Sequence, residues 1–205
     1  MNIWIKICGI TCSEDALMAE KMGASAVGFV FFDKSPRCIS PGDAGKISEV
    51  LNPLTARVGV FVDEDRDTVK DIVEAAHLTA VQLHGSEDKE YIDTFKDITV
   101  IKALRVTQDF VPELLTRYTV NMYLLDTYSK NAYGGTGESF DWRIARKCAD
   151  YGRIILAGGL DAANVREAVS VAQPWGIDLS SGVESRPGRK DREKMTALFQ
   201  VLHGM

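Results

Sequence analysis

Short apolar runs alternate with longer amphipathic segments along the whole chain. Runs rich in Ile, Val, Leu and Phe recur at intervals of roughly 20 to 30 residues, and each precedes a polar stretch and a segment with helical periodicity. Repetition of a strand and then a helix predicts parallel strands joined by crossover helices. The predicted strands are 3–8, 26–31, 56–62, 80–85, 99–106, 121–127, 153–159 and 176–182.

Helix-start signals mark several of the segments between these runs. Ser40 precedes Pro41, which is the order expected for a cap followed by proline in the first turn. Ser13 precedes two acidic residues and is the expected N-cap of a helix that reaches Met22. Further helices are expected at 141–151, 161–173 and 190–203, with a weaker signal at 109–117 because of its early proline.

Eight strand–helix units without a glycine-rich linker favour a closed (β/α)8 TIM barrel, as a single domain over residues 1–205. An open doubly wound sheet usually stops at five or six strands and carries a pattern such as GxGxxG after the first strand. Here the first run leads into Cys-Gly-Ile-Thr-Cys. Functional groups of such barrels project from the carboxyl ends of the strands, so the ends of the runs are the first candidates for chemistry.

Composition narrows the class of protein further. With 45% hydrophobic and 26% charged residues and a net charge of −5, the chain is typical of a soluble globular protein and does not favour a nucleic-acid surface. No apolar run is long enough for a membrane span, and the N-terminus lacks the pattern of a signal peptide. We therefore expect a cytoplasmic protein with no membrane or nucleic-acid partner.

The cysteines and histidines show no metal-binding spacing. None of the cysteines forms a CxxC pair, so we expect no metal, and disulfides are disfavoured in a reducing compartment. Cys12, Cys38 and Cys148 are interpreted as small, partly buried thiols. Cys8 differs because it ends the first run, at the rim of the barrel where functional groups lie. From its position alone, a packed thiol and a reactive thiol are equally good interpretations.

Asp126 ends the sixth run directly after two leucines. Apolar neighbours raise the pKa of a carboxyl group, which would suit a general acid near neutral pH, although a solvated carboxylate that caps the next loop is the alternative. The glycine-rich segment 128–137 follows it and could close over a ligand.

The ends of the seventh and eighth runs predict an anion site. Gly158 and Gly159 end one, and Ser180, Ser181 and Gly182 end the other. Adjacent glycines let backbone amides approach an anion, and barrels commonly hold phosphate between these two loops. We expect the amides around Gly159 and Ser181, with the Ser181 hydroxyl, to bind a phosphate group.

Two further side chains face the same mouth from other loops. The planar guanidinium of Arg37 has parallel N–H donors that suit a carboxylate, and the alternative is an ordinary surface arginine. His84 ends the fourth run and could act as a base or could hold a loop through a backbone hydrogen bond.

Strand parity predicts a buried ion pair. If Cys8 points into the barrel, Lys6 does so too, and Asp178 does the same on the eighth strand if Ser180 faces the mouth. The first and eighth strands of a closed barrel are neighbours. Lys6 and Asp178 should therefore approach each other below the site, either to favour the Cys8 thiolate or only to fill the barrel.

These stretches together resemble phosphoribosylanthranilate isomerase, a family of the tryptophan pathway. The resemblance is carried, in order along the chain, by IKICGIT, VGFVF, KSPRCIS, VGVFV, VQLHG, LLDT, GGTG with SFDW, AGGL and DLSSGVES. It spans almost the whole chain, and KICG, QLHG and SSGVE together are highly specific. Two departures are Glu138, where the family more often has Lys, and Cys38, where an aromatic residue is common.

The resemblance implies a TIM barrel that needs no cofactor and performs an Amadori rearrangement. It implies that Cys8 is the base, that Asp126 is the acid and that Arg37 belongs to the anthranilate pocket. The glycines of AGGL and the serines of SSG would hold the phosphate of a small phosphorylated substrate. We include His84, Asp178 and Gly182 among the substrate-binding candidates and expect a monomer or a homodimer.

Three other functions compete with this one. Indole-glycerol-phosphate synthase would need a Lys and Glu set at the strand ends; Lys6 and Lys102 precede strand ends, but no matching Glu is evident. A ribulose-phosphate epimerase would need several His and Asp metal ligands, whereas His84 is the only histidine at a strand end. A catalytically silent anion-binding barrel would have no need of both Cys8 and Asp126.

Overall fold

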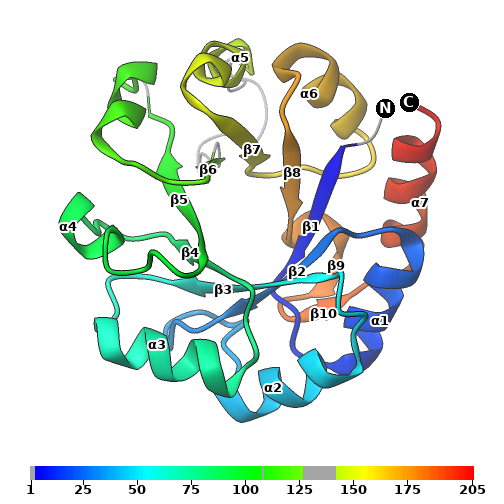
Figure 1. Ribbon diagram of the computed structural model, residues 1–205. Coiled ribbons are helices and arrows are strands. Elements are labelled where there is room, and N and C mark those ends of the chain that lie inside the picture. The colour runs from blue at the N-terminus through cyan, green and yellow to red at the C-terminus, as the bar shows by residue number, and fades with distance from the viewer. Residues whose placement is uncertain (1–2, 108, 127–141) are drawn as a thin grey trace.

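The fold is a closed barrel of eight parallel strands in the order of the sequence. The structure is a computed structural model that describes residues 3–107, 109–126 and 142–205. Figure 1 looks down the barrel, with the helices outside the strands. The expected TIM barrel is confirmed. The strands are β1 (Trp4–Cys8), β2 (Ala26–Val30), β3 (Ala56–Phe61), β4 (Ala80–Leu83), β5 (Thr99–Arg105), β6 (Met122–Asp126), β7 (Arg153–Ala157) and β8 (Gly176–Leu179).

Helices connect the strands around the outside of the barrel, and a short hairpin follows β8. The α-helices are α1 (Ser13–Met22), α2 (Pro41–Val50), α3 (Arg66–Ala75), α4 (Lys89–Ile92), α5 (Arg143–Cys148), α6 (Val165–Ala172) and α7 (Arg192–His203). The 3-10 helices are η1 (Pro112–Arg117), η2 (Ala149–Tyr151) and η3 (Ser181–Val183), and the hairpin strands are β9 (Glu184–Arg186) and β10 (Arg189–Lys190). None of the described helices is long and apolar enough to cross a membrane.

The helix starts follow the capping signals at one site and depart from them at another. Ser40 caps α2 by accepting a hydrogen bond from the Asp43 amide at 3.1 Å, and Pro41 is the first helical residue, as expected. The prediction of Ser13 as a cap is wrong. Ser13 already lies inside α1, and Cys12 occupies the cap position without a side-chain hydrogen bond. Glu14 and Asp15 in the first turn of α1 still stabilise the helix, because their negative charges lie at the positive end of the helix dipole.

The other helix boundaries also differ from those predicted. The predicted helix 161–173 begins only at Val165, since the Asp161 carboxylate accepts hydrogen bonds from the Ala163 and Asn164 amides and forms a turn first. The predicted helix 190–203 begins after its cap, Asp191. The weak segment 109–117 forms only the 3-10 helix η1. The first residue of the predicted helix 141–151 lies outside the described residues, and the remainder forms α5 and η2.

Alternate strand residues supply two separate apolar cores. One core lies inside the barrel and consists of Ala26, Val58, Ala80, Ile101, Ala103, Met122, Leu124, Ile155 and Ala157. The larger core lies between the barrel and the helices and includes Phe29, Phe61 and Leu125. Since inward side chains recur every second residue, the last inward residue of each strand reaches the same open end of the barrel.

Candidate active site

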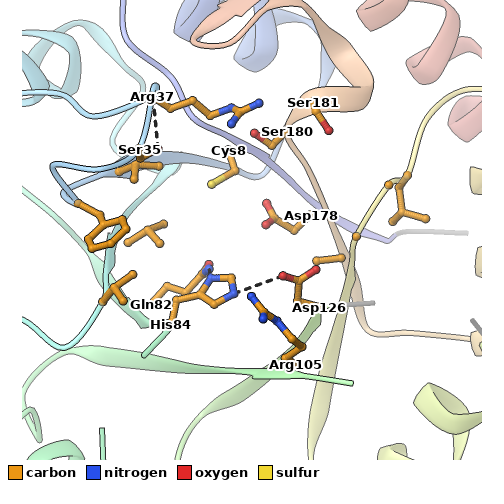
Figure 2. Close-up of a pocket in the computed structure, with 18 of the residues that line it drawn as sticks. Cys8, Ser35, Arg37, Gln82, His84, Arg105, Asp126, Asp178, Ser180 and Ser181 are labelled. Atoms are coloured by element: carbon orange, nitrogen blue, oxygen red, sulfur yellow. Dashed lines mark hydrogen bonds and ion pairs between the residues drawn. The ribbon is translucent and has the colours of Figure 1, made fainter. Parts of the chain in front are cut away.

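The carboxyl ends of the strands surround a cavity of roughly 450 Å³. All ten predicted site residues line it and are therefore brought together from six strand ends and their loops. They are Cys8, Arg37, His84, Asp126, Gly158, Gly159, Asp178, Ser180, Ser181 and Gly182. Figure 2 shows the labelled side chains of this set around one space. The segment 128–137 and Glu138 lie outside the described residues.

Cys8 ends β1 with its side chain toward the cavity, and only 7% of the residue is exposed. The pKa of its thiol lies above the ordinary value, chiefly because of burial and also because of Asp178, while the charges of Lys6 and Lys190 act in the opposite direction. The thiolate therefore depends on the balance of charges beneath it.

The predicted ion pair below Cys8 is confirmed. The ammonium of Lys6 lies 3.0 Å from the Asp178 carboxylate, and its side chain is completely buried. Burial opposes the charge on Lys6, but Asp178 and Cys8 outweigh burial and hold the pKa of the ammonium above its ordinary value. Lys6 thus remains a cation inside the barrel.

Gly28 on β2 makes room for these two side chains, and the sequence prediction did not include it. A methyl group at this position would lie 2.8 Å from the Cys8 sulfur and 2.9 Å from Cε of Lys6. Both distances are shorter than van der Waals contact allows. The signal in the sequence was a glycine inside an apolar strand, which often marks close approach of another group.

Asp126 ends β6 beside the imidazole of His84. Its Oδ2 lies 3.5 Å from Nε2 of His84, and Figure 2 marks this contact. Arg105 ends β5 with an exposed guanidinium next to the same pair. The sequence prediction did not include Arg105; the signal for it is a charged residue near the end of the apolar run 99–106.

Arg37 is anchored by a carboxylate that the sequence did not reveal. Its Nε donates to Glu184 at 2.9 Å, and its Nη2 donates to the other oxygen at 2.6 Å. Glu184 also pairs with the buried ammonium of Lys190 at 2.9 Å. The hydrogen bonds to Glu184 raise the pKa of Arg37 above its ordinary value against the effect of burial. This bidentate pairing fixes the plane of the guanidinium at the cavity wall.

The loops after β7 and β8 touch each other at the predicted anion site. Gly158 and Gly159 have φ values of 97° and 66°, in the left-handed region that favours glycine. A side chain at Gly182 would clash with the carbonyl oxygen of Leu160. A methyl group at Gly159 would meet no atom within 4 Å, so this backbone borders open space. The two loops therefore bring backbone close to a small ligand.

Lys102, one of the two lysines considered for the rival synthase, does not line the cavity. Lys102 lies between Ile101 and Ala103, which point into the barrel, so its side chain points outward. Its ammonium pairs with the buried Glu87 at 2.6 Å, and Lys102 is not among the residues that line the cavity. This pair anchors the loop after β4, because Glu87 also accepts hydrogen bonds from the Gly85 amide.

The remaining cysteines differ in exposure. Cys148 is buried and Cys12 is half-buried, in agreement with the prediction of partly buried thiols. Cys38 is exposed, so the prediction is wrong for this residue. It lies on the loop after β2, where the chain crosses the surface between Arg37 and Ile39.

Comparisons with known proteins agree with this geometry. A model of the N-(5′-phosphoribosyl)anthranilate (PRA) isomerase family matches residues 5–201. The chain is 50% identical to N-(5′-phosphoribosyl)anthranilate isomerase of Geobacter sp. (strain M21), over 93% of each chain. It is 42% identical to the crystal structure of phosphoribosyl anthranilate isomerase from Thermotoga maritima, with a TM-score of 0.90 over 100% of both chains.

A further solved structure of this enzyme shows a ligand of the expected class. It holds reduced 1-(o-carboxyphenylamino)-1-deoxyribulose 5-phosphate, is 40% identical to this chain and has a TM-score of 0.88 over 100% of both chains. The resemblance noted in the sequence is thus confirmed over nearly the whole length. The chain belongs to the N-(5′-phosphoribosyl)anthranilate isomerase family.

Proposed function

We propose that the barrel mouth converts N-(5-phosphoribosyl)anthranilate to 1-(2-carboxyphenylamino)-1-deoxyribulose 5-phosphate in tryptophan biosynthesis, with Asp126 as acid and Cys8 as base. One observation carries this proposal: both groups border the same cavity, and the two predicted phosphate loops lie between them. The strands follow one another as β6, β7, β8 and β1 around the barrel. An acid, an anion site and a base therefore succeed one another along one side of the mouth.

The reaction needs an acid first. Asp126 donates a proton to the ring oxygen of the ribose as the bond from that oxygen to C1 breaks. The nitrogen lone pair forms the double bond to C1, which gives a protonated Schiff base, and Asp126 is left as a carboxylate. A carboxyl group held beside a hydrogen-bond donor such as His84 suits this step, because the donor stabilises the resulting anion.

The base acts in the second step. The Cys8 thiolate removes the proton from C2, and the electrons of that bond form the C1–C2 double bond of an enolamine. Proton transfer from the enol oxygen and protonation of C1 then give the ketone. An ordinary thiol is mostly protonated at neutral pH. Burial and Asp178 hold the pKa of the Cys8 thiol above its ordinary value, and the Lys6 and Lys190 ammonium groups oppose this shift and so favour the thiolate that this step requires.

Binding at both ends would fix C1 and C2 between these groups. The phosphate is assigned to the loops with Gly158, Gly159 and Ser181, and the aryl end to the side of Arg37. Glu184 holds Nε and Nη2 of Arg37, which leaves Nη1 to face a ligand carboxylate. His84, Asp178, Ser180 and Gly182 would complete the wall around the ribose.

The proposal also covers the setting of the enzyme. It acts in the cytoplasm on a small phosphorylated substrate, needs neither cofactor nor metal, binds no nucleic acid, and is a monomer or a homodimer. One solved relative consists of monomers generated from the dimeric phosphoribosylanthranilate isomerase of Thermotoga maritima. Light scattering of the purified protein separates a monomer from a dimer.

Growth of a tryptophan auxotroph that lacks only this isomerase tests the proposed function. The wild-type gene should restore growth without tryptophan, and the Asp126→Asn gene should not, although both proteins accumulate to the same level. The purified wild-type protein should also consume the aryl amine substrate, followed by its anthranilate fluorescence. A silent anion-binding barrel would bind inorganic phosphate but would neither restore growth nor consume the substrate.

A further inference from the structure

A chain of polar contacts crosses the floor of the cavity from β1 to β6. The Lys6 ammonium lies 2.8 Å from Oε1 of Gln82, and Nε2 of Gln82 lies 3.0 Å from Nδ1 of His84. Nε2 of His84 lies 3.5 Å from Oδ2 of Asp126. Figure 2 shows Gln82 and His84 next to each other, with His84 facing Asp126. Gln82 is 1% exposed and uses both ends of its amide in this chain.

The direction of every hydrogen bond in this chain follows from Lys6. An ammonium group can only donate, so the Gln82 atom that faces it must be the oxygen. The amide nitrogen therefore faces His84, and it too can only donate. Nδ1 of His84 must accept, and in a neutral imidazole the proton is then on Nε2. That N–H points at the Asp126 carboxyl group.

We propose that Gln82 is a positioning residue that holds His84 in its Nε2–H tautomer, so that His84 donates to Asp126. This inference rests on the role of Asp126 as the acid in the proposed function. Gln82 acts through His84, and the buried charge of Lys6 orients Gln82. The positive group beneath the base thereby also sets the hydrogen-bond pattern at the acid, on the other side of the mouth.

The tautomer determines where the proton of the acid resides. With Nε2–H directed at Oδ2, the Asp126 proton belongs on the other oxygen, from which it passes to the substrate. The same N–H stabilises the carboxylate that remains after the transfer. In the opposite tautomer, the Nε2 lone pair would attract the carboxyl proton and compete with the ring oxygen. A separation of 3.5 Å is at the outer limit of a hydrogen bond, so the proposal needs the two groups to move closer as the proton is transferred.

The imidazole spectrum of ¹⁵N-labelled protein tests the tautomer directly. The chain has only three histidines, His77, His84 and His203, and the signals of His84 are those that disappear in His84→Asn. At neutral pH, wild-type His84 should show one protonated nitrogen, Nε2, and one unprotonated nitrogen, Nδ1. A wild-type spectrum with the proton on Nδ1 would overturn the proposal.

Two variants of equal length separate the orientation of the amide from its bulk. In Gln82→Glu the side chain can only accept, so Nδ1 of His84 should become protonated. In Gln82→Met the volume is kept while both hydrogen bonds are lost. We expect turnover to fall about tenfold or more in Gln82→Glu, with KM changed much less, and to fall less in Gln82→Met. An unchanged His84 spectrum in Gln82→Glu would contradict the role of Gln82.

A double-mutant cycle shows whether the effect passes through His84. In a His84→Ala background, Gln82→Glu should cause little further loss of turnover. An equal loss in both backgrounds would mean that Gln82 acts without His84 and would reject the proposal. If Gln82→Glu does not fold, Gln82→Met and the wild-type spectrum still test whether Gln82 holds His84 in its Nε2–H tautomer. Normal turnover of Asp126→Asn would instead reject the acid assigned in the proposed function, while the spectrum would still report the tautomer.

Discussion

At the scale of single residues, the site depends on charges that are buried and paired. Lys6 is inside the barrel, below the thiol that it influences, and its partner Asp178 is part of the cavity wall. A lone buried ammonium would be costly or would lose its proton, and the paired one keeps it. The sequence predicted this pair from strand parity, because side chains alternate along a strand whatever the rest of the fold does.

Cys8→Ser and Asp126→Asn should each lower turnover on the order of a hundredfold or more, with KM changed much less. Each change removes one proton-transfer group and keeps the size of the side chain. Steady-state kinetics on purified variants, with circular dichroism as the control for folding, measures this. Near-normal turnover in either variant would remove that residue from the mechanism.

The pH dependence should move in opposite directions in two matched variants. The base must be a thiolate, so the rate rises with pH through the pKa of Cys8. Lys6 lowers that pKa and Asp178 raises it. Lys6→Met should therefore shift the rise of kcat/KM to higher pH, and Asp178→Asn should shift it to lower pH.

The pH–rate profiles of both variants are compared with that of the wild type. If neither profile moves, the ion pair only fills the barrel. Should Lys6→Met not fold because Asp178 has lost its partner, Asp178→Asn still decides the question.

At the scale of elements, the loops after β7 and β8 form one unit through direct backbone contact. Gly182 can approach Leu160 only because it lacks a side chain. α6, which follows the first of these loops, begins later than Asp161 indicated, since Asp161 first closes a turn. This turn extends the loop at the cavity before α6 begins.

Gly182→Ala should separate the two loops and weaken phosphate binding. The added methyl group would meet the Leu160 carbonyl, which belongs to the backbone and cannot rotate away. Loss of one or two hydrogen bonds to a charged group corresponds to roughly a 10- to 100-fold increase in KM and in the inhibition constant of inorganic phosphate.

Gly42→Ala is the matched control for this change. Gly42 lies in α2, and a methyl group there meets no atom within 4 Å. Both variants are assayed with the substrate and with inorganic phosphate as the inhibitor. Equal inhibition constants for Gly182→Ala and the control would place the anion elsewhere.

At the scale of the whole molecule, closure of the barrel joins the two ends of the sequence. β1 pairs with β8, with Lys6 opposite Asp178 and Trp4 opposite Gly176. Closure leaves none of the eight strands with an unpaired edge and brings Cys8, the proposed base on β1, next to the proposed anion loop after β8. The stability of this seam therefore supports the site as well as the fold.

Gly176→Ala should destabilise the folded molecule without affecting the chemistry. A methyl group there would lie 2.9 Å from the Trp4 ring and 3.0 Å from its carbonyl oxygen, neither of which moves easily. Overpacking of this kind costs about 1–3 kcal/mol. Urea unfolding should show the loss relative to the wild-type protein, while turnover per folded molecule stays unchanged. Unaltered stability would mean that the seam relaxes freely.

The sequence by itself determined the barrel, the set of residues at its mouth and the pairing of Lys6 with Asp178. These depend on local periodicity and on the order of the strands, both of which can be counted along the chain. Its errors were also local: the cap at Ser13, the start of the helix near Asp161, and the burial of Cys38 depend on neighbours that a residue pattern does not specify.

Only the tertiary structure decided which side chains meet across the cavity. Glu184 reaches Arg37 from 147 positions away, and Gln82 links Lys6 to His84 across the barrel floor. Position 28 requires glycine only because Cys8 and Lys6 fill the space that a side chain there would need. Such contacts depend on the stagger between strands and on the height at which each side chain ends. Periodicity tells which side of a strand a residue faces, but the partner on that side is set by the closed barrel.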